Sequence, residues 1–183
     1  MSDPFATLEG TLAHVWQRLG RGTADARDPF RFVTLATVGA RGPQARTVGL
    51  RRASRSEAAV EVHSDLRTEK VEALRHDPRA EILAWDSRRQ VQVRLAGGMT
   101  LIPADPDRWA RVPEGSRTNY GTDPAPGTPV EAPEAVGRTP EIERFVALRM
   151  AVARIDVVSL KHEPHRRALF VAADGFAGAW TAP

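Results

Sequence analysis

The chain has 183 residues, with 42% hydrophobic and 27% charged residues, which is typical of one globular domain with a sizeable core. The net charge of +3 does not require a nucleic-acid partner, and no apolar run approaches the roughly 20 residues that span a bilayer. The absence of cysteine excludes disulfides and thiolate metal sites, and the first residues lack a signal-peptide pattern. We therefore expect a single cytoplasmic domain over residues 1–183, without a membrane or nucleic-acid partner.

The N-terminal segment predicts an amphipathic helix over residues 4–20. Its apolar residues recur at spacings of three and four: Phe5, Leu8, Leu12, Val15, Trp16 and Leu19. Ser2 or Asp3 is placed to cap this helix, and Gly20 or Gly22 is expected to end it.

The next part of the chain predicts two β-hairpins separated by a strand and a helix. Residues 31–38 and 44–52 form the first hairpin, and residues 79–85 and 90–101 form the second. Between them we expect a strand at 59–64 and a helix at 68–75. Gly49 predicts a close backbone approach, such as that of a flat ligand, and Gly97-Gly98 predicts a bulge.

The C-terminal part predicts fewer regular elements. We expect a short helix at 105–112, a long surface loop at 113–140 that is rich in proline and glycine, and a short helix at 140–148. Strands follow at 150–160 and 168–172, with a last run ending at Trp180. Six or seven strands with few helices predict a small antiparallel barrel.

The segment from residue 44 to residue 76 predicts a corner that holds a phosphate. Arg46 lies on one strand, Ser64 ends the next, and Thr68 and Lys70 lie at the mouth of the following helix. Free backbone N–H groups at a helix start bind anions, and a cation on the first turn opposes the helix dipole. A bound phosphate would offset that penalty.

These residues occur in an order that resembles the pyridoxamine 5'-phosphate oxidase family of FMN-binding split barrels. The matching pieces are Arg46-Thr-Val-Gly-Leu-Arg51, His63-Ser-Asp-Leu-Arg-Thr-Glu-Lys70, Pro78-Arg-Ala80, Gln92-Val-Arg-Leu-Ala-Gly97 and His165-Arg-Arg167, within residues 28–180. The resemblance implies a mainly β fold, a six- to seven-stranded antiparallel split β-barrel with peripheral helices. It also implies a homodimer that binds FMN at the subunit interface.

The resemblance assigns cofactor roles to individual residues. Those expected to contact FMN are Arg46, Thr47, Val48, His63, Ser64, Thr68, Lys70, Gln92 and Arg167, with Gln90 as the alternative to Gln92 if the register slips by two. Arg167 would reach the flavin of the partner subunit. Where the family often has an arginine this chain has Glu69, so Arg67 is expected to supply the missing cation.

On the substrate side the likeness is partial. The residues expected to bind substrate are Arg51, Arg111, Ser116 and His165, while Glu163 stands where the oxidase has an arginine. The resemblance therefore implies a small-molecule substrate other than pyridoxamine phosphate. No catalytic residue is assigned, because redox chemistry would come from the flavin.

Three functional hypotheses follow. The first is an FMN-dependent oxidoreductase of the pyridoxamine 5'-phosphate oxidase type. The second is a non-catalytic flavin- or haem-binding split barrel with a storage or sensing role, and the third is a cofactor-free interaction module. The pair His162 and His165 suggests a metal, but Pro164 prevents a helical pair, so we expect no metal site.

Overall fold

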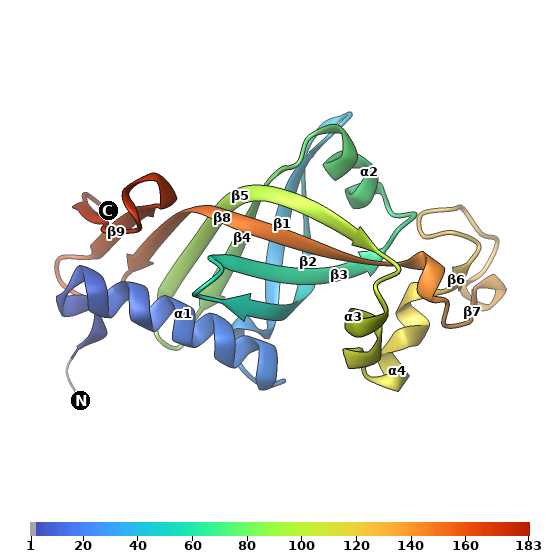
Figure 1. Cartoon of the computed structure of the whole chain (residues 1–183), viewed down its shortest axis with the longest axis horizontal. Helices are drawn as coiled ribbons and strands as arrows, with labels where there is room; N and C mark the ends of the chain where they lie inside the picture. Colours follow the sequence, from blue (N-terminus) through green and yellow to red (C-terminus); the bar gives the residue numbers. More distant parts are fainter. Residues whose placement is uncertain (1–2) are drawn as a thin grey trace.

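Six antiparallel strands close into a barrel in this computed structural model, which describes residues 3–183. They are β1 (Phe32–Gly39), β2 (Gly42–Ser54), β3 (Ala59–Asp65), β4 (Arg79–Asp86), β5 (Val91–Pro103) and β8 (Phe145–Ser159). The order is β8-β3-β2-β1-β4-β5, and pairing of β5 with β8 closes the ring (Figure 1). Two further strands, β9 (Arg166–Val171) and β10 (Ala179–Thr181), extend the sheet beyond β8. The split-barrel fold is therefore confirmed.

The long strands β5 and β8 make closure possible. The first half of β8 pairs with both β3 and β5, and its second half pairs with β5 and β9. The β5–β8 register shifts between Ala96 and Gly97, where a methyl group on Gly97 would stand 2.0 Å from the carbonyl oxygen of Ala151. The bulge predicted at Gly97 is confirmed, and its glycine is required by this close approach.

The strands bury alternate side chains inside the barrel. Val91, Val93 and Leu95 of β5 are at most 3% exposed, as their alternation predicts, and Leu35 and Leu50 from β1 and β2 are fully buried beside them. The outward residues between them carry the polar side chains that matter for function.

The N-terminal helix differs from its prediction at both ends. A short 3-10 turn, η1 (Pro4–Ala6), is capped by Asp3, and α1 (Leu8–Ala24) begins only after Thr7, whose hydroxyl accepts from Gly10 N at 3.0 Å. Ser2, the other predicted cap, lies outside the described residues. The helix continues past both predicted stop glycines. Gly22 instead provides room for Phe30, because a Cβ on Gly22 would lie 2.7 Å from the carbonyl oxygen of Phe30.

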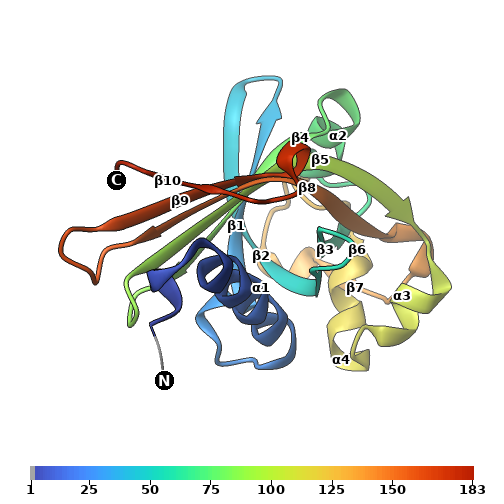
Figure 2. The ribbon, with the colours of Figure 1, turned by 60° about the vertical axis from the view of Figure 1, so that its left-hand side comes forward.

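The remaining helical elements are short. They are η2 (Pro29–Arg31), α2 (Glu69–His76), α3 (Pro106–Arg111), α4 (Glu114–Arg117), η3 (Thr118–Tyr120), η4 (Pro133–Ala135), η5 (Ile142–Arg144) and η6 (Ala172–Asp174). Figures 1 and 2 show α3 and α4 at the end of the barrel away from β9 and β10, with α1 along one side. Within residues 3–183 no helix is long and apolar enough to cross a membrane.

Two predictions for the segment 113–148 were wrong. The segment 113–140 is not wholly irregular, because it contains α4, η3, η4 and a two-stranded ladder of β6 (Thr122–Asp123) and β7 (Gly137–Arg138). The helix predicted at 140–148 is replaced by η5 and the start of β8. Residues Phe145–Leu148 are fully buried and pair with strands on both sides, so pairing and burial override helix propensity there.

Candidate functional site

A gap between β2 and β3 forms the frame of the candidate site. The β2–β3 ladder runs from Ser54 opposite Ala59 to Leu50 opposite Val62, while β2 continues to pair with β1 as far as Gly42. Among the described residues, the stretch of β2 from Gln44 to Gly49 therefore pairs on one side only. Its other side presents backbone groups toward the opening, which is the strand edge expected for a flat ring.

Arg46 lies at this opening and is held entirely by neutral groups. Its Nη1 donates to Thr37 Oγ1 at 2.7 Å and to Gln44 O at 3.2 Å, and its Nη2 donates to Gln44 Oε1 at 3.1 Å. Burial lowers the pKa of Arg46, and the more distant Glu69 partly opposes this. The guanidinium is thus fixed in position without a carboxylate bonded to it.

Lys70 approaches the same opening from the first turn of α2. Its Nζ donates to Ser64 Oγ at 3.2 Å, and Ser64 Oγ lies 3.0 Å from Thr68 Oγ1. The Thr68 hydroxyl donates to the carbonyl of Asp65 at 2.8 Å and makes no capping bond to the helix. Ser64, Thr68 and Lys70 therefore form one cluster of donors beside the free N–H groups of the helix start.

The charge of Arg46 acts on Lys70. The pKa of Lys70 is lowered first by burial and then by the charge of Arg46, while Asp65 opposes the shift. Two like charges in a half-buried place are unfavourable unless an anion joins them. This donor set fits the phosphate group of FMN.

The other charged residues near the corner are engaged elsewhere. Arg67 donates to both oxygens of Asp65, at 3.0 and 2.7 Å, and to Thr122 O at 2.8 Å, and its pKa is raised by the bond to Asp65. It does not supply the missing cation that was expected of it. Glu69 pairs with Arg41 at 3.2 Å at the surface and also accepts a hydrogen bond from Gln44 Nε2, so it reaches Arg46 only through Gln44.

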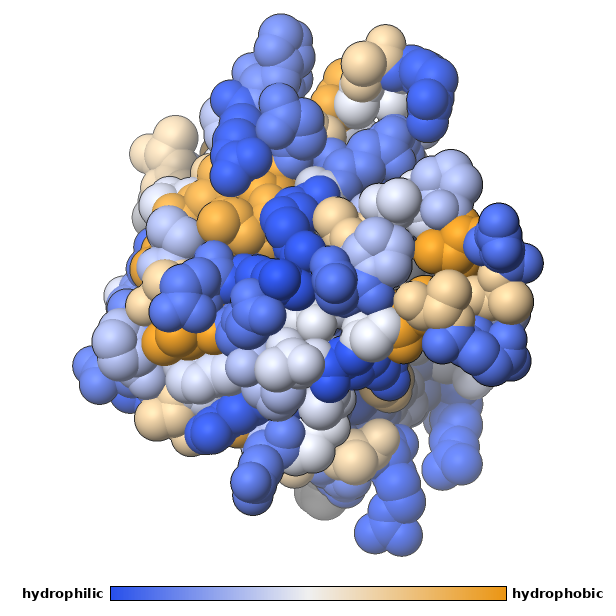
Figure 3. All heavy atoms as spheres, turned by 90° about the vertical axis from the view of Figure 1, so that its right-hand side faces the viewer, coloured by the Kyte–Doolittle hydropathy of each residue, from blue (hydrophilic) through white to orange (hydrophobic). Residues whose placement is uncertain are grey.

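Besides this gap, a cavity of about 360 Å³ lies on the outer side of β2 and β3 against α3 and α4. It collects Arg51, Arg111 and Ser116, three of the four predicted substrate-binding residues, together with His63. We call this cavity the arginine pocket, because Arg31, Arg52 and Arg108 also line it. Figure 3 looks onto the end of the molecule with α3 and α4, where hydrophilic residues surround smaller hydrophobic patches.

Two buried polar atoms in the arginine pocket lack a partner among the described residues, Arg51 Nη1 and His63 Nδ1. The opposite ring nitrogen of His63 lies 3.1 Å from Glu61 Oε1, and Glu61 Oε2 accepts from Arg108 Nε at 3.0 Å. Because Glu61 is an acceptor, Nε2 of His63 carries a proton, which makes Nδ1 the acceptor of the neutral ring. The walls of the pocket thus hold one unused donor and one unused ring nitrogen.

Gly49 lies directly beneath Arg51. A methyl group on Gly49 would stand 2.6 Å from the Arg51 guanidinium. The close approach predicted at this glycine is therefore real, but the flat group involved is the guanidinium of the same strand. Gly49 gives Arg51 its place in the pocket.

The remaining predicted site residues lie at the other end of the sheet. Gln92 on β5 and Arg167 on β9 are both register partners of Val158, so they lie at the same level on the two strands that flank β8. Arg167 is bonded to Asp156 through two N–H groups, at 3.0 and 2.8 Å. His165 and Arg167 line another cavity, of about 450 Å³, with Trp180. Gln90 lies in the turn before β5, with φ of 52°, so Gln92 is the glutamine that the strand carries.

Sequence reasoning missed several residues that shape the site. Glu61 and Arg108 fix His63, Thr37 holds Arg46, and Tyr120 packs edge-on against Phe145 beside His63. Burial raises the pKa of Tyr120, and the nearby charge of Arg51 opposes the rise. Strand alternation places Glu61 on the face of His63, which was an available signal. No sequence pattern indicated the contacts that Arg108 of α3 and Thr37 of β1 make with the site.

Comparison with known proteins shows what the chain is similar to. Residues 13–103 match the model of the pyridoxamine 5'-phosphate oxidase, FMN-binding domain family. Pyridoxine/pyridoxamine 5'-phosphate oxidase 2 of Arabidopsis thaliana is 29% identical over 175 residues, covering 83% of this chain and 86% of its own.

Two solved structures extend the comparison to the full length. A pyridoxamine 5'-phosphate oxidase-related, FMN binding protein of Nostoc punctiforme superposes with a TM-score of 0.75 and 26% identity, covering all of both chains. PhzG of Burkholderia lata, solved with tetrahydrophenazine-1-carboxylic acid, has a TM-score of 0.69 and 16% identity and covers all of this chain and 94% of its own, which shows a shared fold. By its family match and its fold, the chain belongs to the pyridoxamine 5'-phosphate oxidase-like proteins.

Proposed function

We propose that the chain binds FMN, with the phosphate held by Arg46, Ser64, Thr68 and Lys70. The observation that carries this proposal is the pair of half-buried cations, in which burial and the charge of Arg46 lower the pKa of Lys70 and neither has a bonded carboxylate. Charge-assisted bonds to phosphate are about twice as strong as neutral ones. The single-sided stretch of β2 at Thr47 and Val48 offers its backbone to the flavin ring.

The proposed activity is that of an FMN-dependent oxidoreductase acting on a small organic anion. When bound, FMN supplies the two-electron redox chemistry. The chain's own residues bind and orient the substrate: Arg51 and Arg111 attract its anionic group, and His63 Nδ1 accepts a hydrogen bond from an O–H or N–H group. Glu61 keeps the His63 proton on Nε2, so this acceptor stays available.

A second copy of the chain completes the proposed site. Gln92, His165 and Arg167 lie away from the phosphate corner within one chain, toward the end formed by β9. Phe32 and Trp85, on the outer faces of the neighbouring strands β1 and β4, are 61% and 42% exposed. Exposed aromatic residues on a sheet face favour a contact between subunits. We infer a homodimer in which Arg167 reaches the flavin of the partner subunit.

The test begins with the absorption spectrum of protein mixed with FMN and desalted. A retained flavin spectrum supports the cofactor, and a colourless protein contradicts it. Anaerobic reduction of the bound flavin is then followed with NADPH and with pyridoxamine 5'-phosphate and other small amines or alcohols that carry an anionic group. Reduction that Arg51→Ala slows supports the oxidoreductase. Bound flavin that none of these reduces favours the storage or sensing role.

A further inference from the structure

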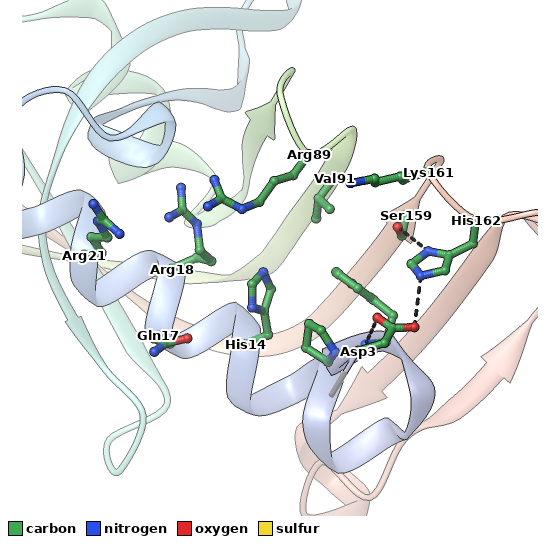
Figure 4. A pocket seen from close by; sticks show the side chains of 12 residues that line it. Asp3, His14, Gln17, Arg18, Arg21, Arg89, Val91, Ser159, Lys161 and His162 are labelled. Atoms are coloured by element: carbon green, nitrogen blue, oxygen red, sulfur yellow. Dashed lines mark hydrogen bonds and ion pairs between the residues drawn. The ribbon is translucent and has the colours of Figure 1, made fainter. Parts of the chain in front are cut away.

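A further cavity, of about 660 Å³, shares no lining residue with the arginine pocket. It is enclosed by α1, by the segment Asp3–Phe5, by the start of β5 and by the end of β8 with the residues that follow (Figure 4). None of the residues proposed above to hold FMN or substrate lines it. We call it the helix pocket.

One wall of the helix pocket is cationic. Arg18 is buried, and its Nη2 donates to Asp28 at 2.9 Å and to Asp86 at 3.3 Å, but its Nε has no partner among the described residues. Arg89 donates to Asp86 at 3.0 Å from the other side. These carboxylates lie behind the guanidinium groups, which Figure 4 shows next to each other at the cavity. The acids therefore fix the cations and neutralise part of their charge.

Lys161 and His14 add two side chains to the cavity that are not held by partners within the described residues. No ion pair joins Lys161 to a carboxylate within residues 3–183, and Figure 4 shows its side chain extending toward Val91. His14 makes no side-chain hydrogen bond in that range, and burial, followed by the charges of Arg18 and Arg89, lowers its pKa. Four permanent cations line the pocket, and Asp3 is the one carboxylate in its lining.

The opposite wall is aromatic and rigid. The ring of Phe5 packs edge-on against His14, with centroids 5.4 Å apart, and lies tilted against His162, with centroids 5.6 Å apart. His162 is fixed in turn, with Nδ1 2.9 Å from Ser159 Oγ and Nε2 3.0 Å from Asp3 Oδ2. Such a Ser–His–Asp chain could suggest a nucleophile. Ser159 is only 1% exposed and Asp3 is shared with Arg166, so the chain serves to fix the wall.

We propose that the helix pocket is a second binding site, for a small organic anion with a flat apolar body. Its anionic group faces Lys161, Arg89 and the unpartnered Nε of Arg18. Its body lies against Phe5 and Val91. The combination of a cationic wall with an aromatic wall favours an aromatic carboxylate over a bare inorganic ion.

Isothermal titration of the full-length protein, saturated with FMN, with 2-naphthoate tests this site. Saturation with FMN keeps the probe out of the cofactor corner. We expect binding that falls roughly tenfold in Lys161→Gln and in Arg89→Gln, the usual effect of losing one charged hydrogen bond. Arg88→Gln is the matched control, because Arg88 is the exposed neighbour of Arg89 and does not line the pocket. It should bind like the unmodified protein.

A matched ligand separates charge from apolar contact. Uncharged 2-naphthol should bind at least tenfold more weakly than 2-naphthoate, and inorganic phosphate should not displace the naphthoate at equal concentration. Absence of binding at millimolar 2-naphthoate would overturn the proposal. Equal affinities for all three variants, or for naphthoate and naphthol, would do so as well. Circular dichroism of each variant verifies that a lost affinity is not a lost fold.

Discussion

The guanidinium of Arg51 rests on Gly49, two residues earlier on β2, so closely that a methyl group there would stand 2.6 Å from it. The pair shows how the backbone sets the shape of the arginine pocket. An alanine at position 49 must displace the guanidinium, whereas the strand itself tolerates alanine.

Gly49→Ala is therefore expected to destabilise the protein by about 1 kcal/mol when Arg51 is present. In an Arg51→Ala background the same change should be neutral or slightly stabilising, because the obstacle is gone. Urea denaturation of the four proteins measures this coupling. Equal effects of Gly49→Ala in both backgrounds would show that Arg51 does not occupy this place in solution.

Glu61 is the acid on which His63 and Arg108 depend. Burial alone would raise the pKa of Glu61, but the hydrogen bonds from His63 and Arg108 lower it overall. Because the folded pKa lies below that of the unfolded chain, its stabilisation is fully present above about pH 4.3 and is lost as pH falls through the folded pKa.

We expect Glu61→Gln to reduce the free energy of unfolding by about 2 kcal/mol at pH 7, because it breaks a largely buried ion pair. Glu72→Gln, which breaks the exposed pair with Arg75, should cost less than about 0.5 kcal/mol. Denaturation at pH 7 and at pH 3 measures both variants. A difference between Glu61→Gln and the native chain that does not shrink between pH 7 and pH 3 would contradict the assignment.

Lys70 gives anion binding a distinctive pH dependence. Burial and the charge of Arg46 lower its pKa below the roughly 10.4 of a free lysine. The ammonium is lost as pH rises through this lowered pKa, so FMN affinity should start to fall at a lower pH than an ordinary lysine would allow. Lys70→Arg stays charged and should keep its affinity over that range. Identical alkaline profiles for the two proteins would remove Lys70 from the phosphate site.

The proposed dimer rests on the outer face of β1 and β4. Phe32→Glu combined with Trp85→Glu places two charges on that face and should convert a dimer into a monomer, as measured by light scattering after gel filtration. Val130→Glu, an exposed hydrophobic position in the 113–140 segment, is the control and should leave the dimer intact. A native chain that is monomeric at micromolar concentration would refute this arrangement.

Much of the barrel could be predicted because its signals are local. Alternation in Val91–Leu95, the turn residues around Gly42 and the glycine at the Gly97 bulge each act within a few residues. The helix predicted at 140–148 failed because burial of Phe145 between two strands is a long-range effect. The end of α1 was also misplaced, because Gly22 lies inside the helix and leaves room there for the backbone of Phe30.

The candidate site divides in the same way. Arg46, Ser64, Thr68 and Lys70 come together as their order along the chain predicted. Arg67 did not, because the carboxylate of Asp65, two residues away, captures its guanidinium. The hydrogen bond from Arg108 to Glu61 joins α3 to β3 across 47 residues of sequence, and no local pattern predicts it.

Titration with FMN and with riboflavin, which lacks the phosphate, tests the phosphate corner most directly. In Arg46→Ala/Lys70→Ala, FMN should bind at least a hundredfold more weakly, because each lost charged bond contributes about 1.5–3 kcal/mol, while riboflavin affinity should change little. Arg41→Ala, at the exposed pair with Glu69, is the matched charge control. Unchanged FMN affinity in the folded double variant, or an equal loss for riboflavin, would contradict the account.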